Sequence, residues 1–155
     1  MNPWNTAFRR GLAGGAASSV LSTVALAALG KGEAASAYAP TIAISHWIWG
    51  EEAVRHAEPT LRHTLTGYLI HHSCATFWAV IFERSCGRLL DRRQPAITLG
   101  AGTAAAAVAC FVDYQLTPRR LRPGYEEHLS RPALAVVYGA FGLGLALGAM
   151  LSRRP

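Results

Sequence analysis

The sequence predicts an all-α membrane protein with four transmembrane helices, and three observations indicate this fold class. Charged residues make up 15% of the 155 residues, whereas about 25% is typical of a soluble domain. Hydrophobic residues make up 51% and gather in four runs, each close to the ~20 residues that a helix needs to cross the hydrocarbon core. The basic residues lie at the ends of these runs, where membrane topology places them. We therefore expect one membrane domain over 1–155.

The first predicted helix spans 8–30 and has two arginines in its first turn. It is rich in small residues, and Gly11 and Gly15 have the GxxxG spacing that lets membrane helices approach closely. This face predicts a tight bundle within the chain or a seam between copies, although glycine is also common in membrane helices generally. The alternative for the whole run is a signal peptide with a cleavage site at 35–37, but the apolar stretch is longer than the usual ~7–15 residues.

A long loop, 31–63, separates the first two predicted helices. Its middle, 38–58, mixes isoleucine and tryptophan with glutamate, arginine and histidine. This mixture predicts a helix that lies flat in the membrane interface with its apolar side down, opened by Pro40 and ended by Pro59. A short re-entrant segment is the alternative.

The second predicted helix, 64–82, carries two adjacent histidines. An ionisable residue inside a membrane helix is a candidate functional residue and should face the other helices. On a helical wheel, His72 lies on the more polar stripe, which ends at Glu83. Glu83 lies at the opposite membrane surface beside Arg84, and we expect it to act as an interfacial anchor.

The third predicted helix is 96–116 and the fourth is 132–151, and the loop between them is punctuated by prolines. Ser130 is the predicted N-cap of the fourth helix, with a proline in the first turn. The GxxxG spacing recurs in this helix at Gly144 and Gly148. We therefore expect the fourth helix, like the first, to pack closely against a neighbour.

The distribution of basic residues favours a cytoplasmic N-terminus. With that orientation, eight arginines fall in short cytoplasmic stretches, and seven basic residues are spread over outside loops about twice as long. The predicted cytoplasmic arginines are Arg9, Arg10, Arg84, Arg88, Arg92, Arg93, Arg153 and Arg154.

A family resemblance extends over 71–118. Four helices rich in small residues, with histidine near the start of the second and Thr117-Pro118 after the third, resemble uncharacterised small bacterial inner-membrane proteins. The resemblance implies a location in the bacterial inner (cytoplasmic) membrane.

The predicted topology gathers all six histidines on one side of the membrane, together with Asp113 near the end of the third helix. Imidazoles beside carboxylates are ligands for zinc, copper or iron, and they also relay protons. No HExxH or paired ExxH motif is present, so a transition metal, haem, a proton path through His72 and Asp113, and purely structural histidines all stay open. The candidate metal ligands are His71, His72, His63, His56 and His46.

A charged segment leads from the third helix into the second long loop, 117–131. Asp113 is followed by a cluster of arginines and then by acidic residues. Because a buried acid needs a partner, this segment predicts a structural ion pair at the helix end, with a site for an anionic ligand or a lipid headgroup as the alternative. The residues concerned are Asp113, Arg119, Arg120, Arg122 and Glu126.

These features indicate a function in the lipid bilayer and exclude some classes of protein. The chain has no basic stripe with interleaved aromatics and no zinc-finger or helix-turn-helix signature, so nucleic acid is not an expected partner. No catalytic residue stands out. We expect a non-enzymatic accessory or interaction subunit that packs into a homo- or hetero-oligomer through its Gly/Ala-rich helix faces. The alternatives are a proton or metal-ion transporter that uses the histidine cluster with Asp113, and a membrane-bound metal or haem redox protein.

Overall fold

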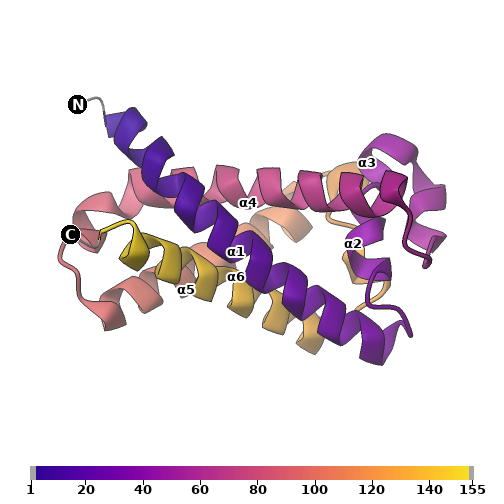
Figure 1. Cartoon of the computed structure of the whole chain (residues 1–155). Coiled ribbons are helices and arrows are strands. Elements are labelled where there is room, and N and C mark those ends of the chain that lie inside the picture. The colour runs from indigo at the N-terminus through magenta and orange to yellow at the C-terminus, as the bar shows by residue number, and fades with distance from the viewer. Residues whose placement is uncertain (1–2, 154–155) are drawn as a thin grey trace. The chain divides into compact units, whose positions relative to one another are not determined.

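The computed structural model describes residues 3–153, and over these residues the chain is helical without strands (Figure 1). The predicted all-α class is confirmed. Arg154, one of the arginines counted for topology, lies outside the described residues. The four long helices are α1 (Pro3–Glu33), α4 (Leu61–Leu90), α5 (Pro95–Phe111) and α6 (Arg131–Leu151).

Shorter helices occupy the two long connections and the end of α5. A five-residue π-helix continues α5 directly. These elements are α2 (Ala39–Ala43), α3 (His46–Trp49), η1 (Glu51–Arg55), η2 (Val112–Leu116), η3 (Arg119–Leu121) and η4 (Tyr125–Glu127).

Three helical stretches are long and apolar enough to cross a membrane: Pro3–Glu33, Pro95–Leu116 and Arg131–Leu151. They contain the predicted first, third and fourth segments. The predicted second segment, 64–82, lies inside α4, which is 30 residues long but is not one of the three. The last turns of α4 carry Glu83, Arg84 and Arg88, so a fourth crossing stays a prediction.

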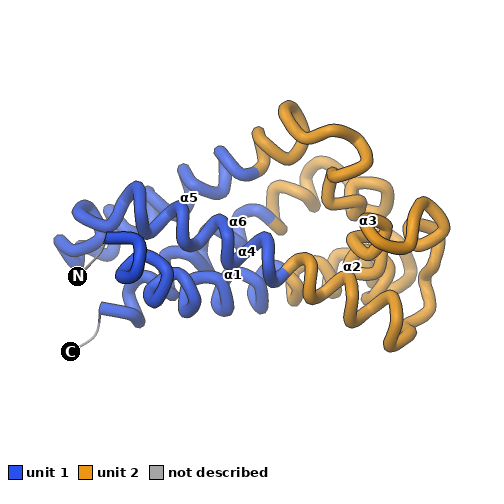
Figure 2. Tube along the Cα trace, turned by 90° about the horizontal axis from the view of Figure 1, so that it is seen from above, with its two compact units in different colours: residues 1–22, 72–109, 138–155 blue, residues 23–71, 110–137 orange. Residues whose placement is uncertain are grey.

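The chain divides into two compact units, and each long helix contributes a segment to both (Figure 2). Unit 1 comprises 1–22, 72–109 and 138–155, and unit 2 comprises 23–71 and 110–137.

In unit 1, α1 and α6 pack where only glycine fits. A Cβ at Gly144 of α6 would clash with the Cα of Ser18 in α1, and a Cβ at Gly148 would clash with the Cα of Gly14. The hydroxyl of buried Ser18 donates to the carbonyl of Gly14 at 2.8 Å, so this polar side chain is satisfied within its own helix. The Gly144–Gly148 face is therefore occupied inside the chain.

The other small-residue face of α1 packs against α4, also within unit 1. A Cβ at Gly11 would lie 2.6 Å from Cγ2 of Val80, and a Cβ at Gly15 would lie 2.5 Å from Oγ1 of Thr76. Real Cβ atoms do not approach heavy atoms this closely because packed interiors have no room for such overlap. Both GxxxG pairs found in the sequence thus serve close packing between helices of one chain.

In unit 2, the segment 39–46 is buried throughout. The carbonyl of Thr41 fits against Gly67 of α4, and a Cβ at Gly30 of α1 would lie 2.7 Å from Cγ of Pro40. Pro40 does lie in the first turn of α2, as predicted. However, 38–58 does not form one continuous helix, because the chain turns after α2 and again at Gly50, whose φ is +78°.

The start of α6 is also fixed within unit 2. The backbone N–H of Ala133 donates to Oγ of Ser130 at 3.4 Å, which confirms the predicted N-cap. Glu33, at the end of α1, accepts hydrogen bonds from the N–H and the hydroxyl of Ser130 at 2.6 and 2.8 Å. This carboxylate therefore ties the end of one long helix to the beginning of another.

Candidate functional site

Helix ends in unit 1 carry an ion-pair network that is partly buried. Arg153, just after α6, donates from both Nη atoms to the two carboxylate oxygens of Glu83 in α4, each at 2.7 Å. These two side chains are only 4% and 3% exposed. The Nε of Arg153 and the Nη1 of Arg10 both donate to Oδ1 of Asp91 at 2.9 Å. Arg10, Asp91, Arg153 and Glu83 are therefore linked in one chain of ion pairs.

The ion pairs of this network stabilise the charged forms of Asp91 and Arg153. Burial by itself would raise the pKa of Asp91, but the hydrogen bond from Arg153 and the charges of Arg10 and Arg153 bring the pKa below its usual value. Burial would lower the pKa of Arg153, yet its bonds to Glu83 and Asp91 raise it. Asp91 and Arg153 thus stay ionised at neutral pH, and a bidentate arginine–carboxylate pair is among the stronger polar contacts.

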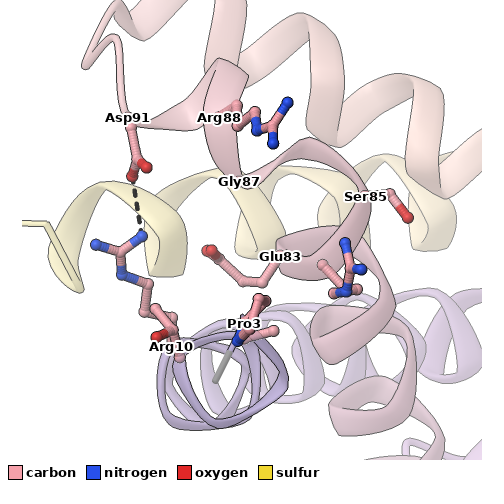
Figure 3. Close-up of a pocket in the computed structure, with 10 residues that line it drawn as sticks. Pro3, Arg10, Glu83, Ser85, Gly87, Arg88 and Asp91 are labelled. Carbon is pink, nitrogen blue, oxygen red and sulfur yellow. Dashed lines mark hydrogen bonds and ion pairs between the residues drawn. The ribbon is translucent and has the colours of Figure 1, made fainter. Parts of the chain in front are cut away.

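A cavity of about 530 Å³ lies beside this network (Figure 3). Its volume falls within the ~300–1,000 Å³ typical of small-molecule sites. Half of its lining residues lie in the last turns of α4, Asp91 follows directly after that helix, and the other four belong to the start of α1. The lining residues are Pro3, Thr6, Ala7, Arg10, Glu83, Arg84, Ser85, Gly87, Arg88 and Asp91.

No pattern in the sequence predicted this network, and the prediction for Glu83 was wrong. Glu83 was expected to anchor the helix at the membrane interface beside Arg84, but its carboxylate is buried against Arg153 instead. The paired residues are 62, 70 and 81 positions apart, so no local spacing rule joins them. The available signal was that Arg10, Glu83 and Arg153 all fall on the predicted cytoplasmic side.

In unit 2, two of the loop histidines bind backbone carbonyls. The buried ring of His46 places Nδ1 2.7 Å from the carbonyl O of Ala43 and Nε2 3.1 Å from that of Arg120. The Nε2 of His128 lies 2.7 Å from the carbonyl O of Val54. Since His46 lies 74 residues from Arg120 and His128 lies 74 residues from Val54, these histidines tie the first long loop to the second.

The structure brings together two of the predicted metal ligands, His56 and His63, whose ring centroids are 4.7 Å apart. The Nδ1 of His63 lies 2.9 Å from Oγ1 of Thr60. Burial, together with the charges of His56 and Arg62, lowers the pKa of His63. These contacts favour a neutral His63 ring held at the start of α4.

The other two predicted ligands lie in adjacent positions of α4, with His71 in unit 2 and His72 in unit 1. Over residues 3–153, no group of three or more histidine, cysteine or acidic side chains is placed to hold a metal ion. A metal site at His46, His56, His63, His71 and His72 therefore stays a prediction.

The charged segment after the third predicted helix is fixed through its backbone. Asp113 lies in η2, and Arg119 and Arg120 lie in η3. The carbonyl of Arg122 accepts a hydrogen bond from Nε1 of Trp47 at 3.0 Å. The Nε of Arg122 donates to the carbonyl of Thr117 at 3.5 Å. An ion pair of Asp113 with one of these arginines stays a prediction.

A carboxylate closes the turn that follows. Glu126 accepts from the N–H of Gly124 at 2.7 Å. Gly124 has a φ of +90°, and a Cβ there would lie 2.9 Å from Nδ1 of His46. Glu126 therefore acts on the local backbone and helps to keep Gly124 against the His46 ring.

Unit 1 thus offers a charged cavity beside a fixed ion-pair network, and unit 2 offers two loops joined by histidine–carbonyl contacts. No protein-family model, curated protein or solved structure matches this chain.

Proposed function

We propose that this chain is a four-span protein of the bacterial inner membrane that acts as a non-enzymatic accessory or interaction subunit. The observation that carries this proposal is an exposed Gly/Ala-rich face on α5. Small residues on a membrane helix allow a second helix to approach closely, and within residues 3–153 this face of α5 is exposed. Its residues are Gly100, Thr103, Ala104 and Ala107.

Large exposed apolar side chains support placement in lipid. They follow the lengths of α1, α5 and α6, and a monomer in water rarely exposes so many. Helices are also the spanning structures that satisfy their own backbone hydrogen bonds in hydrocarbon. The exposed residues include Phe8, Leu12, Val20, Val24, Val108, Phe111, Val136, Leu143, Leu147 and Leu151.

A similar stripe on α4 supports the fourth span. Leu61, Leu65 and Leu69 recur every fourth residue and are exposed, and Phe77 further along the helix is also exposed. With α4 in the membrane, both termini lie in the cytoplasm, and the arginines around the unit 1 ion-pair network lie on that side, as the positive-inside rule favours. We also propose that α1 is retained rather than removed as a signal peptide, because Gly14 and Ser18 form its close contact with α6.

Reporter fusions test the four-span topology. Reporters active only in the cytoplasm are expected to be active at both the N-terminus and the C-terminus, and a fusion after Glu58 is expected to report the outside. Active reporters at one terminus only would leave an odd number of crossings and contradict the topology.

Replacement of Ala104 by leucine tests the interaction face. We expect self-association in lipid bilayers, or recovery of a co-purifying partner chain, to fall by about tenfold, because a large side chain keeps a second helix away. The measurement is single-molecule photobleaching in liposomes, with co-purification from the membrane. Gly139→Leu is the matched control, since a Cβ at Gly139 meets nothing within 4 Å. Equal association of all three proteins, or a wild-type chain that stays monomeric without a partner, would remove the proposal.

The transporter and redox alternatives have weaker support. His46 and His128 contact backbone carbonyls, and His63 contacts a threonine hydroxyl. The described residues hold no three-ligand group. The α5 face therefore favours an interaction subunit over a metal or haem site.

A further inference from the structure

Beyond the interaction role, we propose that the unit 1 cavity binds a phosphate-bearing anion through Arg84, Arg88 and Arg10. The cavity combines three guanidinium groups with two hydroxyls, those of Thr6 and Ser85, around a space of about 530 Å³. Figure 3 shows Arg10, Arg88 and Asp91 disposed around this space. Phosphate oxygens accept hydrogen bonds from both kinds of group, and the planar fork of arginine matches them in pairs.

The two carboxylates of the cavity wall do not oppose an anion, because each is already neutralised. Glu83 is paired with both Nη atoms of Arg153, and Asp91 is paired with Arg153 and Arg10. Over residues 3–153, Arg84 and Arg88 have no carboxylate within ion-pair distance. Four guanidinium groups therefore face two carboxylates here, and the surplus positive charge lies on Arg84 and Arg88.

The two arginines with unmatched charge are placed to act together. Arg84 and Arg88 are one turn apart on α4, so their charges repel each other. The guanidinium of Arg84, which lines the cavity, lies 5.2 Å from the ring centroid of Trp4, within cation–π range. An anion between the two guanidinium groups would relieve the repulsion and accept hydrogen bonds from both.

Gly87 keeps the wall between these arginines open. A Cβ at Gly87 would meet no atom within 4 Å, so packing does not require glycine there. Glycine in a helix interior is less favourable than alanine, and here it leaves the helix surface without a side chain. Gly87 lines the cavity between Arg84 and Arg88, and the absent side chain leaves room for a ligand.

The phosphate has two plausible sources, a lipid headgroup and a soluble phosphate ester. In the proposed topology the cavity lies at the cytoplasmic leaflet, where anionic headgroups and basic side chains attract one another. The full-length protein is therefore tested with two probes. One is phosphatidylglycerol in phosphatidylcholine nanodiscs, and the other is inorganic phosphate with the protein in pure phosphatidylcholine nanodiscs.

Binding is measured by native mass spectrometry for the lipid and by calorimetry for phosphate. We expect Arg84→Gln/Arg88→Gln to weaken binding by about tenfold or more, because charge-assisted hydrogen bonds are lost. The control is Arg92→Gln/Arg93→Gln, which removes two exposed arginines outside the cavity and should change binding by less than about twofold. Gly87→Leu fills the cavity, retains every charge and should also weaken binding.

Each outcome decides the proposal. Cavity-dependent binding of phosphatidylglycerol assigns the headgroup, and cavity-dependent binding of inorganic phosphate assigns a soluble ester. If wild-type protein binds neither probe, or if the cavity and control variants weaken binding equally, the proposal is overturned. The result does not depend on self-association, so it is separate from the test of the α5 face.

Discussion

Arg153→Met is expected to lower the free energy of unfolding by about 3–5 kcal/mol, because it leaves the Glu83 carboxylate buried without its partner. In the folded protein both oxygens of Glu83 are bound by Arg153 at 2.7 Å, and Glu83 is 3% exposed. Little water reaches that carboxylate to replace the lost bonds. The measurement is reversible unfolding by denaturant in mixed micelles, followed by circular dichroism.

A double variant distinguishes the net contribution of the ion pair to stability from the penalty of leaving one buried charge without its partner. Glu83→Leu/Arg153→Met removes both charges, and we expect its stability to lie within about 1–2 kcal/mol of the wild type. Arg10→Met is the exposed control. Its pair with Asp91 joins side chains that are 30% and 54% exposed, and such pairs contribute only about 0–1 kcal/mol. If Arg153→Met unfolds at the same denaturant concentration as Arg10→Met, Glu83 is not buried as described.

Gly144→Ala is expected to destabilise the protein by about 1–3 kcal/mol, because the added methyl group meets backbone rather than flexible side chain. A Cβ at Gly144 would clash with the Cα of Ser18 and lie 2.6 Å from its backbone N. Both α1 and α6 would have to move apart to make room. The measurement is thermal unfolding in detergent, supported by the rate of proteolysis.

Gly139→Ala in the same helix is the matched control. A Cβ at Gly139 meets nothing within 4 Å, so only helix propensity changes, and stability should stay equal or rise by about 0.5–1 kcal/mol. The two substitutions are identical in chemistry and differ only in what surrounds the new methyl group. Equal effects at the two glycines would show that α1 and α6 do not pack at Gly144.

Local patterns in the sequence were sufficient for the long helices. The predicted segments 8–30, 96–116 and 132–151 lie within the three stretches long and apolar enough to cross a membrane. The N-cap at Ser130 was also predictable, because capping depends on residues three positions apart. In both cases the deciding interactions are local, so their residue types and spacing appear directly in the sequence.

Long-range side-chain contacts were not predictable. The histidines were grouped by their side of the membrane, but the structure uses His46 and His128 to bind carbonyls of residues 74 positions away. A backbone carbonyl is present at every residue, so no residue type marks the acceptor in advance. The buried segment 39–46 was likewise predicted at the membrane interface, because its composition does not show that other helices enclose it.

The sequence by itself determined that this chain is helical and that three of its helices can cross a membrane, because apolar runs and their lengths are local properties. Only the tertiary structure decided which glycines touch a neighbouring helix and which charges meet. No sequence pattern marks the four charged residues Glu83, Asp91, Arg10 and Arg153. They form a network because helix packing within unit 1 brings their side chains together. Contacts between residues so far apart depend on that packing, which no local pattern encodes.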